Sequence, residues 1–125
     1  MKKILIIDDD PADQFLNQML LSEHFPEIEV LVAFDGEEAL EILNNEADAP
    51  DLILLDINMP RMNGHEFLIK YSENNQKLTP VIVMLTSSDQ GIDKEKSSTF
   101  NCVKEYLAKP LSVEKIGNLS TLFTK

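Results

Sequence analysis

The sequence predicts an α/β domain in which a parallel β-sheet is covered by helices on both of its faces. Short apolar runs alternate with amphipathic stretches along the whole chain, in five repeats of strand and then helix. The apolar runs are too continuous to belong to a sheet with one face in water. At 125 residues the chain also fits one compact domain. We therefore expect a doubly wound, five-stranded sheet in a single domain over residues 1–125.

The first repeat begins with the run KILIID, which predicts a buried strand over residues 3–8. Residues 11–25 then have helical periodicity, and Pro11 suits a first helical turn because its missing N–H is not needed there. Asp10 is well placed as the N-cap of this helix. The run EVLVAF predicts the second strand over residues 29–34. One face of the expected helix gathers four apolar residues, Phe15, Leu16, Met19 and Leu20.

The second and third repeats follow the same order. Residues 35–46 predict a helix with Asp35 as its N-cap, and Glu38 completes a pair like that of a capping box. The run DLILLDI predicts a strand over residues 51–57, and residues 63–73 predict the next helix. That helix is expected to pack through three apolar residues, Phe67, Leu68 and Tyr71.

The last two repeats differ in the strength of their patterns. Residues 80–86 predict a strand, whereas residues 87–101 are weakly patterned and predict only a marginal, mobile helix. Residues 103–108 predict the fifth strand, and residues 111–123 predict a closing helix with Ser112 as its N-cap. The residues expected to face inward on the closing helix are Val113, Ile116, Leu119 and Leu122.

Composition limits the classes of partner. Twenty-two acidic and 11 basic residues give a formal net charge of −11, which argues against direct binding to nucleic acid or to an anionic membrane. Cys102 is the single cysteine and cannot form an internal disulfide, and neither a secretion leader nor a long apolar run is visible. We expect a cytoplasmic protein whose partners are proteins or cations.

Polar residues close the apolar runs of four predicted strands. Because parallel strands end at one edge of a sheet, and ligands of such sheets bind at that edge, these residues are expected to share a crevice. The residues are Asp8, Asp9, Asp56, Thr86 and, just after the fifth strand, Lys109.

The carboxylates of this crevice need a counter-charge. At a separation of about 5 Å each pair repels by roughly 3 kcal/mol at an effective dielectric constant near 20, and Lys109 alone leaves a deficit. A hard divalent cation such as Mg²⁺ would supply the rest, because it binds a few carboxylates and keeps room for a phosphoryl oxygen. A carboxylate is also a competent nucleophile for phosphoryl transfer.

Four stretches carry a resemblance to a known family: IIDDDP, LILLDINMPRMNG around Asp56, VIVMLTSSD around Thr86, and EYLAKP. The order and spacing of these stretches resemble those of the receiver domain of two-component response regulators, of the stand-alone chemotaxis-regulator type. The resemblance covers essentially the whole chain and implies a flavodoxin-like (βα)5 fold with strand order 2-1-3-4-5.

The resemblance implies a role for each matching residue. Asp56 would accept a phosphoryl group from a phosphohistidine of a sensor histidine kinase, with Mg²⁺ as the cofactor. Asp9 would ligate the metal directly and Asp8 through water, and the backbone carbonyl of Asn58 would complete the protein ligands. Lys109 would hold a phosphoryl oxygen.

The resemblance also implies how phosphorylation is transmitted. Thr86 would turn its hydroxyl toward the phosphate and Tyr106 would swing inward behind it, which changes the surface of helix four, strand five and helix five. A downstream protein would dock on that surface, or the phosphoryl group would pass to a histidine phosphotransfer protein. Only 16 residues follow Lys109, so we expect no DNA-binding or enzymatic output domain. Homodimer formation stays open.

Two alternatives remain. A metal-dependent phosphatase could use the same aspartates on an external substrate, but it usually needs an acid/base aspartate two residues after its nucleophile. Ile57 and Asn58 follow Asp56, although Asp8 and Asp10 do have that spacing. A flavin carrier would need a phosphate-binding loop rich in Ser, Thr and Gly after the first strand, where this chain has carboxylates.

Overall fold

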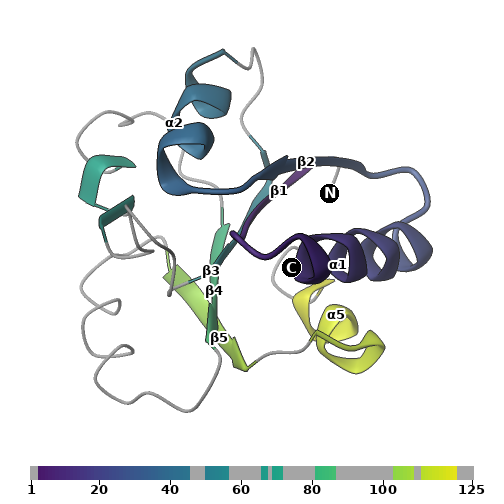
Figure 1. Ribbon diagram of the computed structural model, residues 1–125. Coiled ribbons are helices and arrows are strands. Elements are labelled where there is room, and N and C mark those ends of the chain that lie inside the picture. The colour runs from purple at the N-terminus through teal and green to yellow at the C-terminus, as the bar shows by residue number, and fades with distance from the viewer. Residues whose placement is uncertain are drawn as a thin grey trace.

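The computed structural model describes residues 3–45, 50–56, 66–67, 69–71, 81–86, 103–108 and 111–120. Within these residues the chain alternates strands with helices, as the sequence predicts (Figure 1). The elements are β1 (Lys3–Ile7), α1 (Pro11–His24), β2 (Glu29–Ala33), α2 (Gly36–Asn45), β3 (Leu52–Asp56), β4 (Val81–Thr86), β5 (Val103–Ala108) and α5 (Val113–Ser120). Residues 66–67 and 69–71 are also helical. The weak helix expected over residues 87–101 lies outside the described residues.

Five strands form one parallel sheet in the order β2-β1-β3-β4-β5, which confirms the predicted strand order. The strands β1 and β3 are central and their side chains are buried from Ile4 to Ile7 and from Leu52 to Asp56. Because both faces of these strands are covered, nearly every position is apolar rather than every second one. The edge strand β2 is only half-buried over most of its length.

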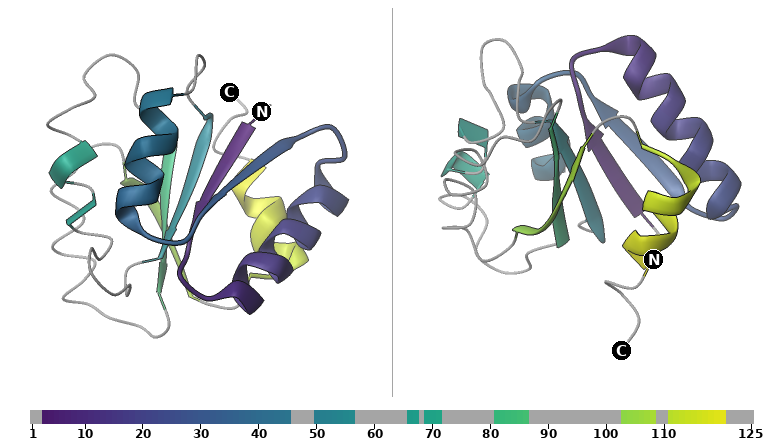
Figure 2. Two further views of the ribbon diagram at one scale, coloured as in Figure 1. Left: turned by 45° about the horizontal axis from the view of Figure 1, so that its top comes forward. Right: turned by 90° about the horizontal axis from the view of Figure 1, so that it is seen from below.

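Helices cover the sheet on both faces (Figures 1 and 2). On one face α2 and the helical residues 66–67 and 69–71 pack over a core to which Leu5, Ile7 and Leu55 contribute. On the other face α1 and α5 lie side by side over a core that includes Ile4 and Ile6. The alternation of β1 side chains between the two cores follows from the two-residue period of a strand.

Local capping signals are confirmed at three helix starts. The Oδ1 of Asp10 accepts the Ala12 N–H at 2.9 Å, and the Oδ1 of Asp35 accepts the Glu38 N–H at 2.8 Å. Glu38 also accepts a backbone N–H, but from Phe34 and not from Asp35, so the capping box is shifted by one residue. The hydroxyl of Ser112 accepts the Lys115 N–H at 3.2 Å and caps α5.

Most of the apolar residues predicted to share one face of α1 do not pack on the core. Leu20 is half-buried against the core, but three apolar neighbours on the same face are exposed. The residues that face the sheet are instead Gln14, Asn17 and Leu21. The three exposed apolar residues are Phe15, Leu16 and Met19, with exposed fractions of 66%, 37% and 43%.

The inward face of α5 is only partly as predicted. Ile116 is fully buried, which confirms it as a core residue. Val113 is 62% exposed, so its predicted inward position is wrong: at this end of α5 the core is filled by Leu111, just before the helix, and by Ile116. The side chains of Leu119 and Leu122 lie outside the described residues. In the helical residues 66–67 and 69–71, the rings of Phe67 and Tyr71 are buried and stacked, with centroids 5.7 Å apart, and Leu68 lies outside the described residues.

No helix in the described parts of the chain is both long and apolar enough to cross a membrane.

Candidate functional site

Three carboxylates meet at the edge of the sheet where β1 and β3 end. Ile7 pairs with Leu55 in the parallel register, so Asp8 and Asp56 occupy neighbouring positions one residue further on. Asp8 is fully buried, Asp56 is 3% exposed, and Asp9 reaches solvent. One carboxylate oxygen from each of the three lies within 4.8 Å of the others. The structure therefore brings together the three aspartates that the sequence predicts.

The charge of this cluster fits a hard cation. Two ionised carboxylates separated by 4.8 Å repel by about 3 kcal/mol at an effective dielectric constant of about 20. Burial of Asp8 and Asp56 also desolvates their carboxylates, and bonds to a cation would offset that cost. The three carboxylates supply oxygen ligands, and Asp9 is exposed to solvent. This arrangement suits a divalent cation that keeps part of its water shell. The acidic cluster is thus a set of groups that could hold a metal.

The loop between β1 and α1 divides the three consecutive aspartates into two roles. The backbone N–H of Asp10 donates to the Oδ1 of Asp8 at 3.0 Å, which orients that carboxylate. The side chain of Asp10 itself turns to the first turn of α1, as its bond to Ala12 shows. The backbone N–H of Gln14 donates to the carbonyl of Asp10 at 3.0 Å and closes the turn. Asp10 is therefore a helix cap, and Asp8 and Asp9 belong to the site.

Gln14 is a residue near the site that the sequence reasoning missed. Its side chain is 1% exposed, and its Nε2 lies 3.1 Å from the carbonyl oxygens of Ile6 and Asp8 and 2.8 Å from that of Ala33. The available signal was the series Gln14, Asn17 and Leu21, whose spacing places polar and apolar residues together on one helix face.

The other predicted site residues are described only in part. Thr86 is the last residue of β4, and the residue before it, Leu85, pairs with Asp56. The backbone of Thr86 therefore reaches the same edge of the sheet as Asp56. Tyr106 lies on β5 and pairs with Met84. The side chains of Thr86 and Tyr106 are outside the described residues, as are Asn58 and Lys109 as a whole. Their predicted roles therefore stay predictions.

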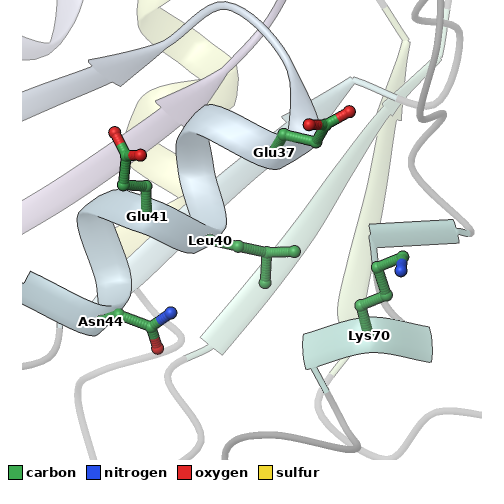
Figure 3. A pocket seen from close by; sticks show the side chains of 5 residues that line it. All are labelled: Glu37, Leu40, Glu41, Asn44 and Lys70. Atoms are coloured by element: carbon green, nitrogen blue, oxygen red, sulfur yellow. The ribbon is translucent and has the colours of Figure 1, made fainter.

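A separate hollow of about 600 Å³ lies between α2 and the helical residues 69–71 (Figure 3). Leu40 points into it from α2, and Lys70 stands across from it. The polar residues of its described lining, Glu37, Glu41, Asn44 and Lys70, are all exposed. The hollow contains none of the three clustered aspartates, so it is a surface groove apart from the acidic site.

Comparison with known proteins identifies the family. Residues 4–119 match the model of the response regulator receiver domain. The chain is 40% identical over 113 residues to the transcriptional regulatory protein CpxR of Klebsiella pneumoniae, an alignment that covers 90% of this chain and 44% of CpxR. The chain thus spans less than half the length of that curated relative.

Solved structures agree with this match. A two-component response regulator from Cytophaga hutchinsonii superimposes with a TM-score of 0.89 and 29% identity, over 98% of this chain and 96% of that one. The phosphorylated cyanobacterial phytochrome response regulator RcpA superimposes with a TM-score of 0.79 and 30% identity, over 98% and 90% of the two chains.

The chain belongs to the response regulator receiver domain family, the phosphoacceptor signalling switches of two-component systems. The predicted fold, the strand order that the resemblance implies and the family resemblance itself are all confirmed. The comparisons give no support to the phosphatase alternative.

Proposed function

We propose that Asp56 is the phosphoacceptor and that it receives the phosphoryl group from a phosphohistidine of a sensor histidine kinase or a histidine phosphotransfer protein. The observation that carries the proposal is the position of Asp56, buried at the end of a central strand with oxygens of Asp8 and Asp9 within 4.8 Å. The similarity to RcpA, whose structure is described as phosphorylated, supports an acceptor role for this fold.

Asp8, Asp9 and Asp56 would hold Mg²⁺, with the backbone carbonyl of Asn58 as a further ligand. When bound, Mg²⁺ supplies positive charge opposite the oxygens of the transferring phosphoryl group. The donor set supports this assignment, because all three side chains offer the hard oxygen ligands that Mg²⁺ prefers. Asp9 is exposed, so the acidic cluster is open to solvent on its side.

The transfer itself needs little more than alignment. An oxygen of Asp56 attacks phosphorus, the new O–P bond forms as the P–N bond to the donor imidazole breaks, and the imidazole leaves with that electron pair. Lys109 would hold a phosphoryl oxygen, and Thr86 would donate its hydroxyl to another. Attack by water on the aspartyl phosphate later returns Asp56 and inorganic phosphate. The protein thereby catalyses only its own phosphorylation and dephosphorylation.

The output would be a changed protein contact. Movement of Thr86 and Tyr106 would alter the face made by helix four, β5 and α5, where a downstream protein or a second copy of the chain docks. A protein donor is supported by the exposed apolar residues Phe15, Leu16 and Met19 of α1, since such groups are typical of contact surfaces. The net charge of −11 disfavours nucleic acid and anionic membranes as direct partners. A cytoplasmic location stays a prediction.

The test is phosphorylation by a small acyl phosphate in the presence of Mg²⁺. We expect a label on Asp56 that is lost in Asp56→Asn and after chelation of the metal. Asp51→Asn is the matched control: Asp51 precedes the same strand at its opposite end, where its carboxylate accepts the Lys3 N–H at 3.1 Å. Labelling of Asp56→Asn as strong as that of the wild type, or turnover of a phosphate ester in excess over protein, would contradict the proposal.

A further inference from the structure

The starting observation is the environment of the Gln14 carboxamide on the inward face of α1. A side chain at this position, 1% exposed and facing a sheet, is ordinarily apolar. Instead, Nε2 of Gln14 is within hydrogen-bond distance of carbonyl oxygens at two neighbouring strand ends: those of Ile6 in β1 and Asp8 just after it, and that of Ala33 in β2. Two N–H groups serve three acceptors, so at least one hydrogen is shared.

These contacts hold the peptide groups on both sides of Asp8. The carbonyl of Asp8 accepts from Gln14 directly at 3.1 Å. The N–H of Asp8 donates to the carbonyl of Ala33 at 3.0 Å, and that same carbonyl accepts from Gln14 at 2.8 Å. Asp8 is thus fixed at its amide and at its carbonyl by a ring of bonds that passes through one side chain of α1.

The fixed carbonyl determines the direction of the next residue as well. The carbonyl of Asp8 is part of the planar peptide group that ends at the Cα of Asp9. Rotation of that peptide would break the bond to Gln14 and would turn the Asp9 side chain away from Asp8 and Asp56, to which it now lies within 4.8 Å. The carboxylate of Asp8 is oriented at the same time by the Asp10 N–H.

Stability alone does not account for a glutamine here. Among the described residues, the Oε1 of Gln14 is buried and finds no hydrogen-bond donor, and a buried acceptor in that condition is unfavourable. An apolar side chain of similar length would bury its end without that cost. The benefit of the carboxamide lies in the geometry that its Nε2 imposes on the loop.

We infer that Gln14 is a positioning residue, whose carboxamide aims the carboxylates of Asp8 and Asp9 at a common divalent cation and so sets the affinity of the acidic site for it. The inference rests on the proposed function, because it treats the cluster of Asp8, Asp9 and Asp56 as the metal site for phosphorylation. Gln14 itself touches neither the metal nor the phosphoryl group. It acts through the Asp8 peptide.

The experiment compares Gln14→Met with Asn17→Leu. Methionine keeps the unbranched shape of glutamine and removes its donor. Asn17 is the matched control because it lies one turn further along the same inward face and is 4% exposed. No hydrogen bond joins it to residues 6–8 in the part of the chain that the structure describes.

The first readout is the dissociation constant for Mg²⁺, measured by titration calorimetry on the intact protein without phosphodonor. We expect Gln14→Met to weaken Mg²⁺ binding by roughly tenfold or more, as loss of groups that orient metal ligands does elsewhere. Asn17→Leu should remain within about twofold of the wild type. Labelling of Asp56 by acetyl phosphate should be slow in Gln14→Met at low Mg²⁺ and should recover at saturating Mg²⁺.

The second readout needs no metal. In chelator, the backbone amides of Asp8 and Asp10 should exchange with deuterium faster in Gln14→Met than in the wild type, with no such change in Asn17→Leu. If Gln14→Met does not fold, Gln14→Asn, which keeps the amide but shortens it by one methylene, replaces it with the same expected direction and a smaller effect.

Three results would overturn the inference. Mg²⁺ affinity in a folded Gln14 variant equal to that of the wild type is the first, and an equal loss in Asn17→Leu is the second, since it would indicate a general packing effect. The third is a labelling defect that saturating Mg²⁺ does not correct. A wild type that neither binds Mg²⁺ nor labels Asp56 would instead refute the proposed function, and the inference with it.

Discussion

The helices α1 and α2 cover opposite faces of the sheet, and they distribute polar and apolar residues in opposite ways (Figure 2). In α2 the inward residues are apolar: Ala39 is fully buried and Leu40 packs against the core. Its outward residues Glu37 and Glu41 are charged and exposed. The sequence of α2 is what burial of one helix face alone would produce.

Over much of α1 the arrangement is the reverse, with polar residues buried and apolar residues exposed. Gln14 and Asn17 face the sheet, while Phe15 and Met19 are 66% and 43% exposed. The difference shows that burial of an apolar face is not the only factor that decides the residues of α1, although Leu21 is buried in the core. The inner face meets backbone carbonyls at the strand ends that carry the acidic site, and the outer face presents apolar groups that the described core leaves uncovered.

The largest expected effect on stability distinguishes Asp8, in the loop before α1, from Asp35, just before α2. Asp8→Asn should raise the free energy of unfolding in chelator by about 2 kcal/mol, because it removes one charge from a group of carboxylates no more than 4.8 Å apart. Asparagine keeps the oxygen that accepts the Asp10 N–H. Urea denaturation with and without Mg²⁺ measures the effect.

The matched control is Asp35→Asn at the start of α2, where asparagine is an equally good N-cap and no change beyond a few tenths of a kcal/mol is expected. Added Mg²⁺ should stabilise the wild type and Asp35→Asn by mass action, and Asp8→Asn much less. A loss of stability for Asp8→Asn in chelator would contradict the repulsion assigned to the cluster.

The next effect tests whether Asp10 belongs to α1 or to the acidic site. Asp10→Ala and Asp35→Ala should each lower the free energy of unfolding by about 1 kcal/mol, because each removes an oxygen that accepts a backbone N–H in the first helical turn. Neither change should alter the dissociation constant for Mg²⁺ by more than about twofold. If Asp10→Ala weakened Mg²⁺ binding as strongly as Asp9→Ala, the division of the three consecutive aspartates would be wrong. Thermal unfolding and calorimetry on the same samples decide between these outcomes.

Much of the fold follows from local sequence. Strands β1 and β3 are predictable because both of their faces are buried, which leaves an apolar run with no polar interruption. The caps at Asp10, Asp35 and Ser112 are predictable because each bond lies within three residues of chain. The acidic site is predictable because parallel strands end at one edge. The order of the strands came only from the family resemblance, since no local pattern encodes it.

The rest depends on contacts between distant parts of the chain. The carbonyl of Ala33 is 19 residues from Gln14, so helical periodicity, which places Gln14 on one face with Asn17 and Leu21, could not reveal that the amide meets the strand ends there. Val113 was mistaken for a core residue because helical spacing cannot tell where the first turn lies relative to the core. Both errors lie at points where a helix terminus adjoins the edge of the sheet.

The smallest expected effect on stability concerns the outer face of α1. Phe15→Ser should change the free energy of unfolding by no more than about 0.5 kcal/mol, because the ring is 66% exposed and the two residues have similar helix propensities. Labelling of Asp56 by acetyl phosphate should also be unchanged. Transfer from a phosphorylated histidine phosphotransfer protein should slow by roughly tenfold if Phe15 is an anchor of the contact, since the few residues that anchor a protein contact each contribute more than about 1 kcal/mol.

The matched control is Val113→Ser, which removes an apolar side chain of nearly equal exposure, 62%, from the start of α5. A defect confined to Phe15→Ser and to the protein donor would mean that α1 is recognised on its outer face. The two faces of α1 would then have separate roles: the outer face would bind the donor, and the buried inner face would hold the loop that carries Asp8 and Asp9. Wild-type rates for both variants with both donors would show that Phe15, on the outer face of α1, has no part in donor recognition. In that case the inverted pattern of α1 would follow from the requirements of its inner face alone.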